Sequence, residues 1–209
     1  MAFEASVASI RRGEQTALVL VAAGAAYNLV EGVLSVAAGI QASSIALIGF
    51  GSDSAIEVTA SLVVLVHLVK RNGAQESALE QRVATYVGLT FIALAAFVAL
   101  KAIADLITQS RPDESYLGIG IACASLVFMP LLARWKHRLA HHINSRALEA
   151  ESRETLVCSY LSVALLLGLG ANALFGWWWA DPVSGLIIVA VIAKEGWEAF
   201  TRKELCCLD

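Results

Sequence analysis

The sequence contains few charged residues and no motif typical of an enzyme. Only 16% of its 209 residues are Asp, Glu, Lys or Arg, whereas 58% are hydrophobic. Neither a His-Glu-x-x-His pair nor a Gly-x-Ser-x-Gly turn occurs, so we predict that the chain is not an enzyme. There is also no basic, aromatic surface of the kind that binds nucleic acid.

The cysteines do not form a disulfide framework. Cys123 and Cys158 lie within apolar stretches, and Cys206 and Cys207 are adjacent near the end of the sequence. Vicinal cysteines on a cytoplasmic tail are expected to stay reduced. We interpret Cys123 as a packing residue, because it has no ionisable neighbour at helical spacing.

The hydrophobic residues occur in long runs. A helix needs about 20 apolar residues to cross a bilayer. Six stretches meet that length: 16–40, 44–69, 84–108, 116–133, 147–175 and 179–200. We therefore predict an all-α integral membrane protein with one six-helix transmembrane domain at residues 16–200. A cytoplasmic segment is expected at 1–15, without the apolar centre of a cleavable signal peptide, and a short cytoplasmic tail at 201–209.

The placement of basic residues predicts the topology. The outer connections hold only Arg111, whereas the presumed inner segments hold twelve Lys and Arg residues. These residues are Arg11, Arg12, Lys70, Arg71, Arg82, Arg134, Lys136, Arg138, Arg146, Arg153, Arg202 and Lys203. Cytoplasmic loops of membrane proteins favour Lys and Arg, so both termini are predicted to lie in the cytoplasm. The predicted location is the inner or plasma membrane, which the chain crosses several times.

Two of the predicted spans carry pairs of metal-binding residue types. Asp53 and Glu57 are four residues apart in the second span, and Glu154 and Cys158 are four residues apart at the start of the fifth. Positions i and i+4 share one helix face, about 5–6 Å apart at Cβ. Ionisable groups inside lipid are costly and usually mark an ion path. We therefore predict that these four residues bind one metal ion.

The ligand types indicate a transition metal. Carboxylates bind many divalent ions, but a thiolate favours softer ions such as zinc over magnesium or calcium. Metal binding requires deprotonated carboxylate and thiol, so binding releases protons and protonation releases metal. The pattern therefore favours a carrier that exchanges a divalent ion, with zinc as the predicted metal, for protons.

Other polar residues allow more than one interpretation. Glu31, near Asn28, is either an outer partner or proton site of the metal centre, or a buried hydrogen-bonded carboxylate. Lys101 and Asp105 indicate an intramembrane ion pair at i, i+4. We interpret the histidines between spans four and five as part of a solvated basic loop rather than a metal site. These histidines are His137, His141 and His142.

Three segments resemble the cation diffusion facilitator family of metal/proton antiporters. SIALIGFGSDSAIEVTAS is similar to its second helix, INSRALEAESRE to the approach to its fifth, and FGWWWADPVSGLIIVAVIAKEGW to its sixth. The resemblance covers about residues 15–200 and implies a six-helix fold, alternating access, export from the cytoplasm and a homodimer. Glu154 and Cys158 stand where the family often has His and Asp, and Glu57 where Asp is typical. The soluble cytoplasmic domain usual in the family is expected to be absent.

We therefore predict a homodimeric exporter of a divalent transition metal, zinc, in exchange for protons across the lipid bilayer. The alternative is a non-transporting membrane metal sensor or partner subunit with the same fold. A passive channel would differ from both by showing metal flux without proton coupling.

Overall fold

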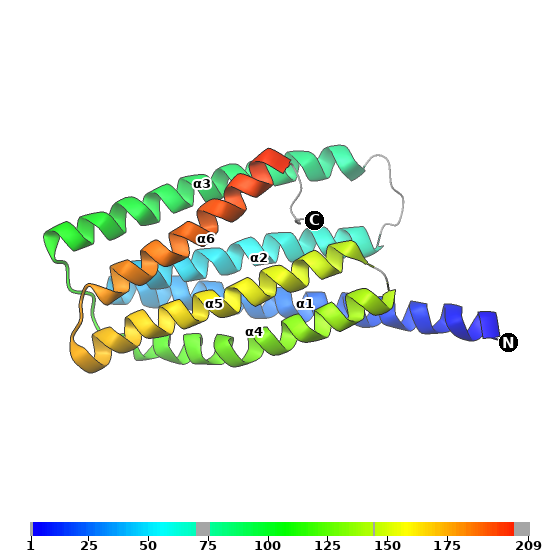
Figure 1. Ribbon diagram of the computed structural model, residues 1–209, viewed down its shortest axis with the longest axis horizontal. Helices are drawn as coiled ribbons and strands as arrows, with labels where there is room; N and C mark the ends of the chain where they lie inside the picture. Colours follow the sequence, from blue (N-terminus) through cyan, green and yellow to red (C-terminus); the bar gives the residue numbers. More distant parts are fainter. Residues whose placement is uncertain (1, 70–75, 144, 203–209) are drawn as a thin grey trace.

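The computed structural model describes residues 2–69, 76–143 and 145–202, and within these residues the chain forms six helices and no strand (Figure 1). The helices are α1 (Ala2–Ala42), α2 (Ile45–Val69), α3 (Glu76–Thr108), α4 (Tyr116–Ile143), α5 (Arg146–Phe175) and α6 (Ala180–Arg202). The all-α prediction is confirmed, and each predicted span falls on one helix in the predicted order.

In the described part of the chain, five helices are long and apolar enough to cross a membrane: α1 to α5. Helix α6 has 23 residues, about 34 Å at 1.5 Å per residue, which also matches the thickness of a bilayer. It carries Asp181, Lys194 and Glu198, so it is less apolar than the others. The chain is therefore a multi-pass membrane protein. The cytoplasmic placement of segments 1–15 and 201–209 stays a prediction, and residues 203–209 lie outside the described residues.

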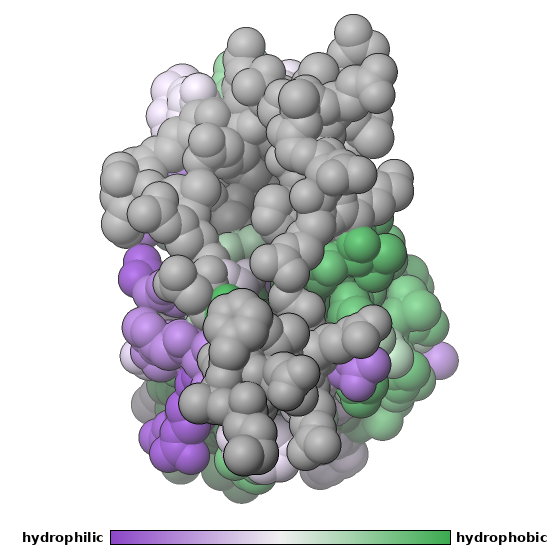
Figure 2. All heavy atoms as spheres, turned by 90° about the vertical axis from the view of Figure 1, so that its right-hand side faces the viewer, coloured by the Kyte–Doolittle hydropathy of each residue, from purple (hydrophilic) through white to green (hydrophobic). Residues whose placement is uncertain are grey.

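The helices pack mainly in three pairs: α1 with α2, α4 with α5, and α3 with α6. Helix α2 contacts α1, α3, α5 and α6, so it occupies the centre of the bundle. In Figure 1, α1, α3 and α5 begin at the right-hand end, where α2, α4 and α6 end. Figure 2 views this end and shows hydrophilic side chains gathered on one side and hydrophobic side chains on the other. Helices α2 and α5 therefore run antiparallel through the middle of the protein.

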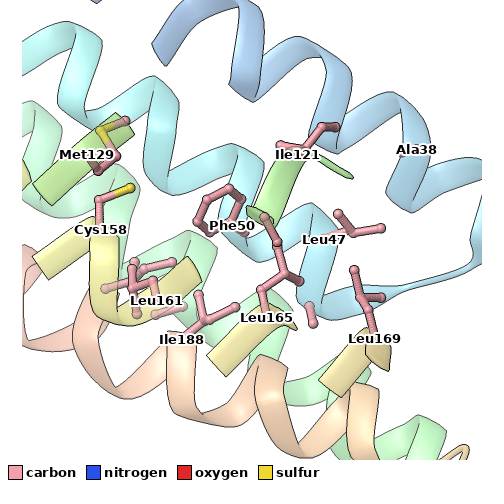
Figure 3. Close-up of a cluster of buried hydrophobic side chains, with 14 of the residues drawn as sticks. Ala38, Leu47, Phe50, Ile121, Met129, Cys158, Leu161, Leu165, Leu169 and Ile188 are labelled. Atoms are coloured by element: carbon pink, nitrogen blue, oxygen red, sulfur yellow. The ribbon is translucent and has the colours of Figure 1, made fainter. Parts of the chain in front are cut away.

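The main hydrophobic core lies between α2, α4, α5 and α6. Phe50 of α2, Met129 of α4, Leu165 of α5 and Ile188 of α6 are each fully buried there. Figure 3 shows these side chains meeting in one cluster, with Cys158 at its edge near Met129. This core fixes how α2 and α5 face each other.

Two polar contacts set the ends of α2 and α5. Ser44 donates a hydrogen bond to Asp181, and Ile45 N donates to Asp181 Oδ2 at 3.1 Å, so the start of α6 caps the start of α2. Ser145 caps α5, with its side chain accepting a hydrogen bond from Leu148 N. Helix α5 therefore begins two turns before Glu154.

Candidate metal centre

Three of the four predicted ligands meet inside the bundle. Asp53 and Glu57 of α2 and Cys158 of α5 are buried, with 3%, 7% and 1% of their surfaces exposed. One ligand atom from each lies within 4.8 Å of the other two. The four-residue spacing on α2 places both carboxylates on the face that packs against α5. The site therefore combines two acids and a thiol in a space closed to solvent.

Glu154 does not belong to this group of three. It is half-buried, one turn before Cys158 on α5. The buried polar face of that helix passes through Glu151, Thr155, Cys158 and Ser162. Four residues turn a helix by 400°, so Glu154 lies about 40° from Cys158, at the edge of that face. Its role as a fourth ligand stays a prediction.

Helix α1 supplies polar partners to the acids of α2. Asn28 Nδ2 donates to Glu57 Oε2 at 2.5 Å, and Asn28 is itself buried. Glu31 is 3% exposed and accepts from Tyr27 Oη at 3.2 Å and from Ser54 Oγ at 3.1 Å. Glu31 is thus a buried hydrogen-bonded carboxylate beside the site, as one of its two interpretations required. Its part in proton exchange stays a prediction.

Helix α4 closes the other side of the site. Ser162 Oγ lies 2.9 Å from the Cys158 carbonyl oxygen and 3.0 Å from Ser125 Oγ on α4. Tyr27 stacks on Phe128 of the same helix, with ring centroids 4.5 Å apart. These contacts link α1, α4 and α5 around Cys158, so the site is enclosed by four helices.

A second buried polar group lies one to two turns from Cys158, between α4 and α5. Lys136 is fully buried, and its Nζ lies 2.9 Å from Glu151 Oε1 and 3.1 Å from Thr155 Oγ1. Ser61 Oγ of α2 donates to the same Glu151 oxygen at 2.7 Å. The same three helices therefore enclose both this ion pair and the metal-ligand group.

This ion pair was not predicted from the sequence. The predicted fourth span ends at residue 133, which leaves Lys136 in a connection, whereas α4 continues to Ile143. Polar residues continue the helix beyond the apolar run because α4 still packs on α5 there. The available signal was the spacing Glu151, Thr155, Cys158, which marks one face of α5.

The other predicted residues have mixed outcomes. The Lys101–Asp105 ion pair is confirmed, with Lys101 Nζ bonded to Asp105 Oδ1. The packing interpretation of Cys123 is wrong, because this side chain is exposed on the surface of α4. Its position faces away from the core and toward the surroundings of the bundle. Cys206 and Cys207 lie outside the described residues.

Comparison with known proteins adds to this geometry. Residues 21–202 match the family described as the cation efflux transmembrane domain. The chain is 24% identical over 178 residues to an uncharacterized transporter of Methanocaldococcus jannaschii, a match that covers 82% of this chain and 62% of that protein. It is 25% identical to the manganese efflux system protein MneS of Bacillus subtilis, over 96% of this chain and 70% of that protein. It is 27% identical to the cation-efflux pump FieF of Shewanella oneidensis, over 50% of this chain and 35% of that protein.

Proposed function

We propose, from the premise that the chain belongs to the cation efflux family, that it exports a divalent transition metal from the cytoplasm in exchange for protons. The observation that carries the proposal is the convergence of Asp53, Glu57 and Cys158 inside the bundle. Two acids and a thiol in a low-dielectric interior require a cation or protons to offset their charge. A site that alternates between the two is an exchanger.

Zinc is the ion that this donor set fits best. Zinc binds carboxylate oxygen at about 2.0–2.2 Å and thiolate sulfur at about 2.3 Å, so tetrahedral ligand atoms lie about 3.4–3.6 Å apart. Ligand atoms already within 4.8 Å of one another reach that separation by small side-chain rotations. One relative is named for manganese efflux, but manganese prefers oxygen ligands to sulfur. The sulfur of Cys158 therefore favours zinc.

A fourth ligand is available one turn away. Glu154 lies about 40° around α5 from Cys158, so a modest helix rotation or a side-chain swing brings its carboxylate toward the other three. Metal entering from the cytoplasm then meets four ligands: Asp53, Glu57, Glu154 and Cys158. Rearrangement of the helices exposes the bound ion to the outside, where protons on these groups release it. A homodimer, as the family resemblance implies, is part of the same proposal.

Transport by purified protein in liposomes tests the proposal. Vesicles with an acidic lumen are expected to accumulate zinc, and collapse of the pH gradient is expected to stop the accumulation. Asp53→Asn is expected to abolish the flux. Asp105→Asn is the matched control, because Asp105 is also a buried acid of a spanning helix but lies outside the site.

Three results would count against the proposal. Equal flux in wild type and Asp53→Asn would exclude the site, and zinc flux without proton coupling would indicate a channel. Zinc binding without flux of any metal would instead favour a sensor or partner subunit with the same fold.

A further inference from the structure

Two histidines and a glutamate meet on the surface where α4 ends and α5 begins. His137 and His141 lie on α4 and Glu149 in the first turn of α5, and one ligand atom from each lies within 4.8 Å of the other two. His137 and His141 are exposed, and Glu149 is half-buried. These histidines were predicted to lie in a solvated basic loop, but α4 holds them one turn apart on a single helix face.

One nitrogen of each imidazole lies close to the other ring. His137 Nε2 and His141 Nε2 are 3.2 Å apart, and the rings meet edge-on at 85°. Zinc binds imidazole nitrogen at about 2.0–2.1 Å, so two tetrahedral nitrogen ligands lie about 3.3–3.4 Å apart. The observed separation is close to that value. The spacing of the two nitrogens therefore suits a divalent ion that both of them bind.

The third group is held in position from the opposite helix. Glu149 Oε1 accepts a hydrogen bond from Arg153 NH2 at 2.9 Å, which orients the carboxylate. Hydrogen bonds of this kind commonly fix carboxylate ligands at metal sites. His141 also lies in the last turn of α4, where the partial negative charge of the helix end favours a cation.

We propose that His137, His141 and Glu149 bind a divalent transition metal ion at a surface site separate from Asp53, Glu57 and Cys158. Imidazole and carboxylate suit zinc, cobalt and nickel. Three protein ligands leave one tetrahedral position for water, unlike structural zinc sites with four protein ligands. The ion is therefore expected to exchange with the medium. The proposal does not depend on transport.

The site lies between the end of α4 and the start of α5, so a bound ion would connect these two helices. His137 follows Lys136 on α4, and Glu149 precedes Glu151 on α5 by two residues, so along both helices the site lies within one helical turn of the buried ion pair. A metal ion bound there ties the end of α4 to the start of α5.

Cobalt and zinc binding to the full chain, purified in detergent with a tag free of histidine, tests the proposal. The matched variants are His137→Gln/His141→Gln and, as control, His142→Gln, which removes a neighbouring exposed histidine outside the cluster. Equilibrium dialysis gives the ions bound per chain. Cobalt spectra separate the two sites, since only a site with a thiolate gives a sulfur-to-cobalt charge-transfer band.

The double variant is expected to lose one bound zinc ion per chain and the cobalt d–d absorption of the nitrogen and oxygen site. His142→Gln is expected to change neither, and Glu149→Gln to weaken binding at the same site. Undiminished zinc stoichiometry and affinity in a folded His137→Gln/His141→Gln variant would overturn the proposal. Absence of the thiolate band while the other absorption persists would count against the intramembrane site alone, so the two proposals fail independently.

Discussion

The buried ion pair between Lys136 and Glu151 gives a sharp test of how this bundle is held together. Side chains of both residues are almost fully buried, 1% and 2% exposed, and the two atoms are 2.9 Å apart. Removing one partner of a buried pair leaves an uncompensated charge and typically costs about 3–5 kcal/mol. Lys136→Met and Glu151→Gln are each expected to lower the free energy of unfolding by that amount.

The double variant is the informative one. Lys136→Met/Glu151→Gln removes both charges, keeps the side-chain volumes and retains an oxygen to accept from Ser61. Additive effects would cost about 6–10 kcal/mol, whereas replacing a whole buried pair is often nearly neutral. We therefore expect the double variant to unfold within about 2 kcal/mol of wild type, with a coupling energy of several kcal/mol.

Reversible unfolding by SDS in mixed micelles, followed by helical circular dichroism, measures these differences. Lys194→Met is the control, because the Lys194–Glu198 pair is 3.9 Å apart and the Lys194 side chain is 74% exposed. Exposed pairs contribute at most about 1 kcal/mol. Single variants as stable as the control, or a double variant whose loss equals the sum of the singles, would refute the reasoning.

Three further predictions concern the site and the packing around it. Cys158→Ser is expected to lower zinc transport relative to manganese transport in proteoliposomes, because a hydroxyl replaces the ligand that favours the softer ion. Asn28→Ala removes the donor to Glu57 Oε2 and is expected to weaken zinc binding about 10–100-fold by calorimetry. Gly32→Ala is expected to cost about 1–3 kcal/mol of unfolding free energy, because the added Cβ would lie 2.9 Å from the carbonyl oxygen of Gly51.

Each of the three has a matched control in the same chain. Cys123→Ser changes an exposed cysteine outside the site, and Asn172→Ala removes a buried amide that donates instead to Pro112 O at 3.0 Å. Gly120→Ala adds a methyl group with no atom within 4 Å, so it is expected to be neutral or slightly stabilising. If a variant and its control change the measured transport, zinc binding or unfolding free energy equally, the contact assigned to that variant is not the cause of the effect.

The helices and half of the site follow from local sequence patterns. Apolar runs of bilayer length fix the spans, and the four-residue spacing of Asp53 and Glu57 fixes a shared face. Neither inference needs knowledge of a neighbouring helix. Cys158 was found from a second four-residue spacing, that of Glu154 and Cys158 on α5. Residues four apart differ by about 40° around a helix, so this spacing alone does not separate Cys158, which meets the two acids, from Glu154 at the edge of that face.

The remaining contacts depend on how the helices are rotated against one another. In the sequence, Lys136 is one of several basic residues that follow an apolar run. Only the packing of α4 on α5 shows that it contacts Glu151. The same packing brings Glu149 to His137 and His141 across a connection between two helices. The sequence does not tell how each helix is rotated about its axis in the bundle. Without that rotation, such buried partners cannot be distinguished from charged residues that face the solvent.

The position of the ion pair explains why Lys136 is compatible with a cation site. Glu151 and Cys158 are seven residues apart on α5, about 10 Å along the helix axis. At an effective dielectric constant of 20, a lone positive charge about 10 Å from a divalent ion would repel it by about 3 kcal/mol, which would lower affinity by more than about 100-fold. Lys136 also contacts Thr155, which is only about 4.5 Å from Cys158 along the helix, so an unpaired Lys136 would repel the ion at least that strongly. Glu151 offsets that repulsion, because its Oε1 lies 2.9 Å from Lys136 Nζ, while Ser61 donates a hydrogen bond to Glu151 and Thr155 Oγ1 lies 3.1 Å from Lys136 Nζ. At the proposed metal site, Asp53 and Glu57 then keep their own negative charge for the ion, although a buried lysine lies one to two helical turns away.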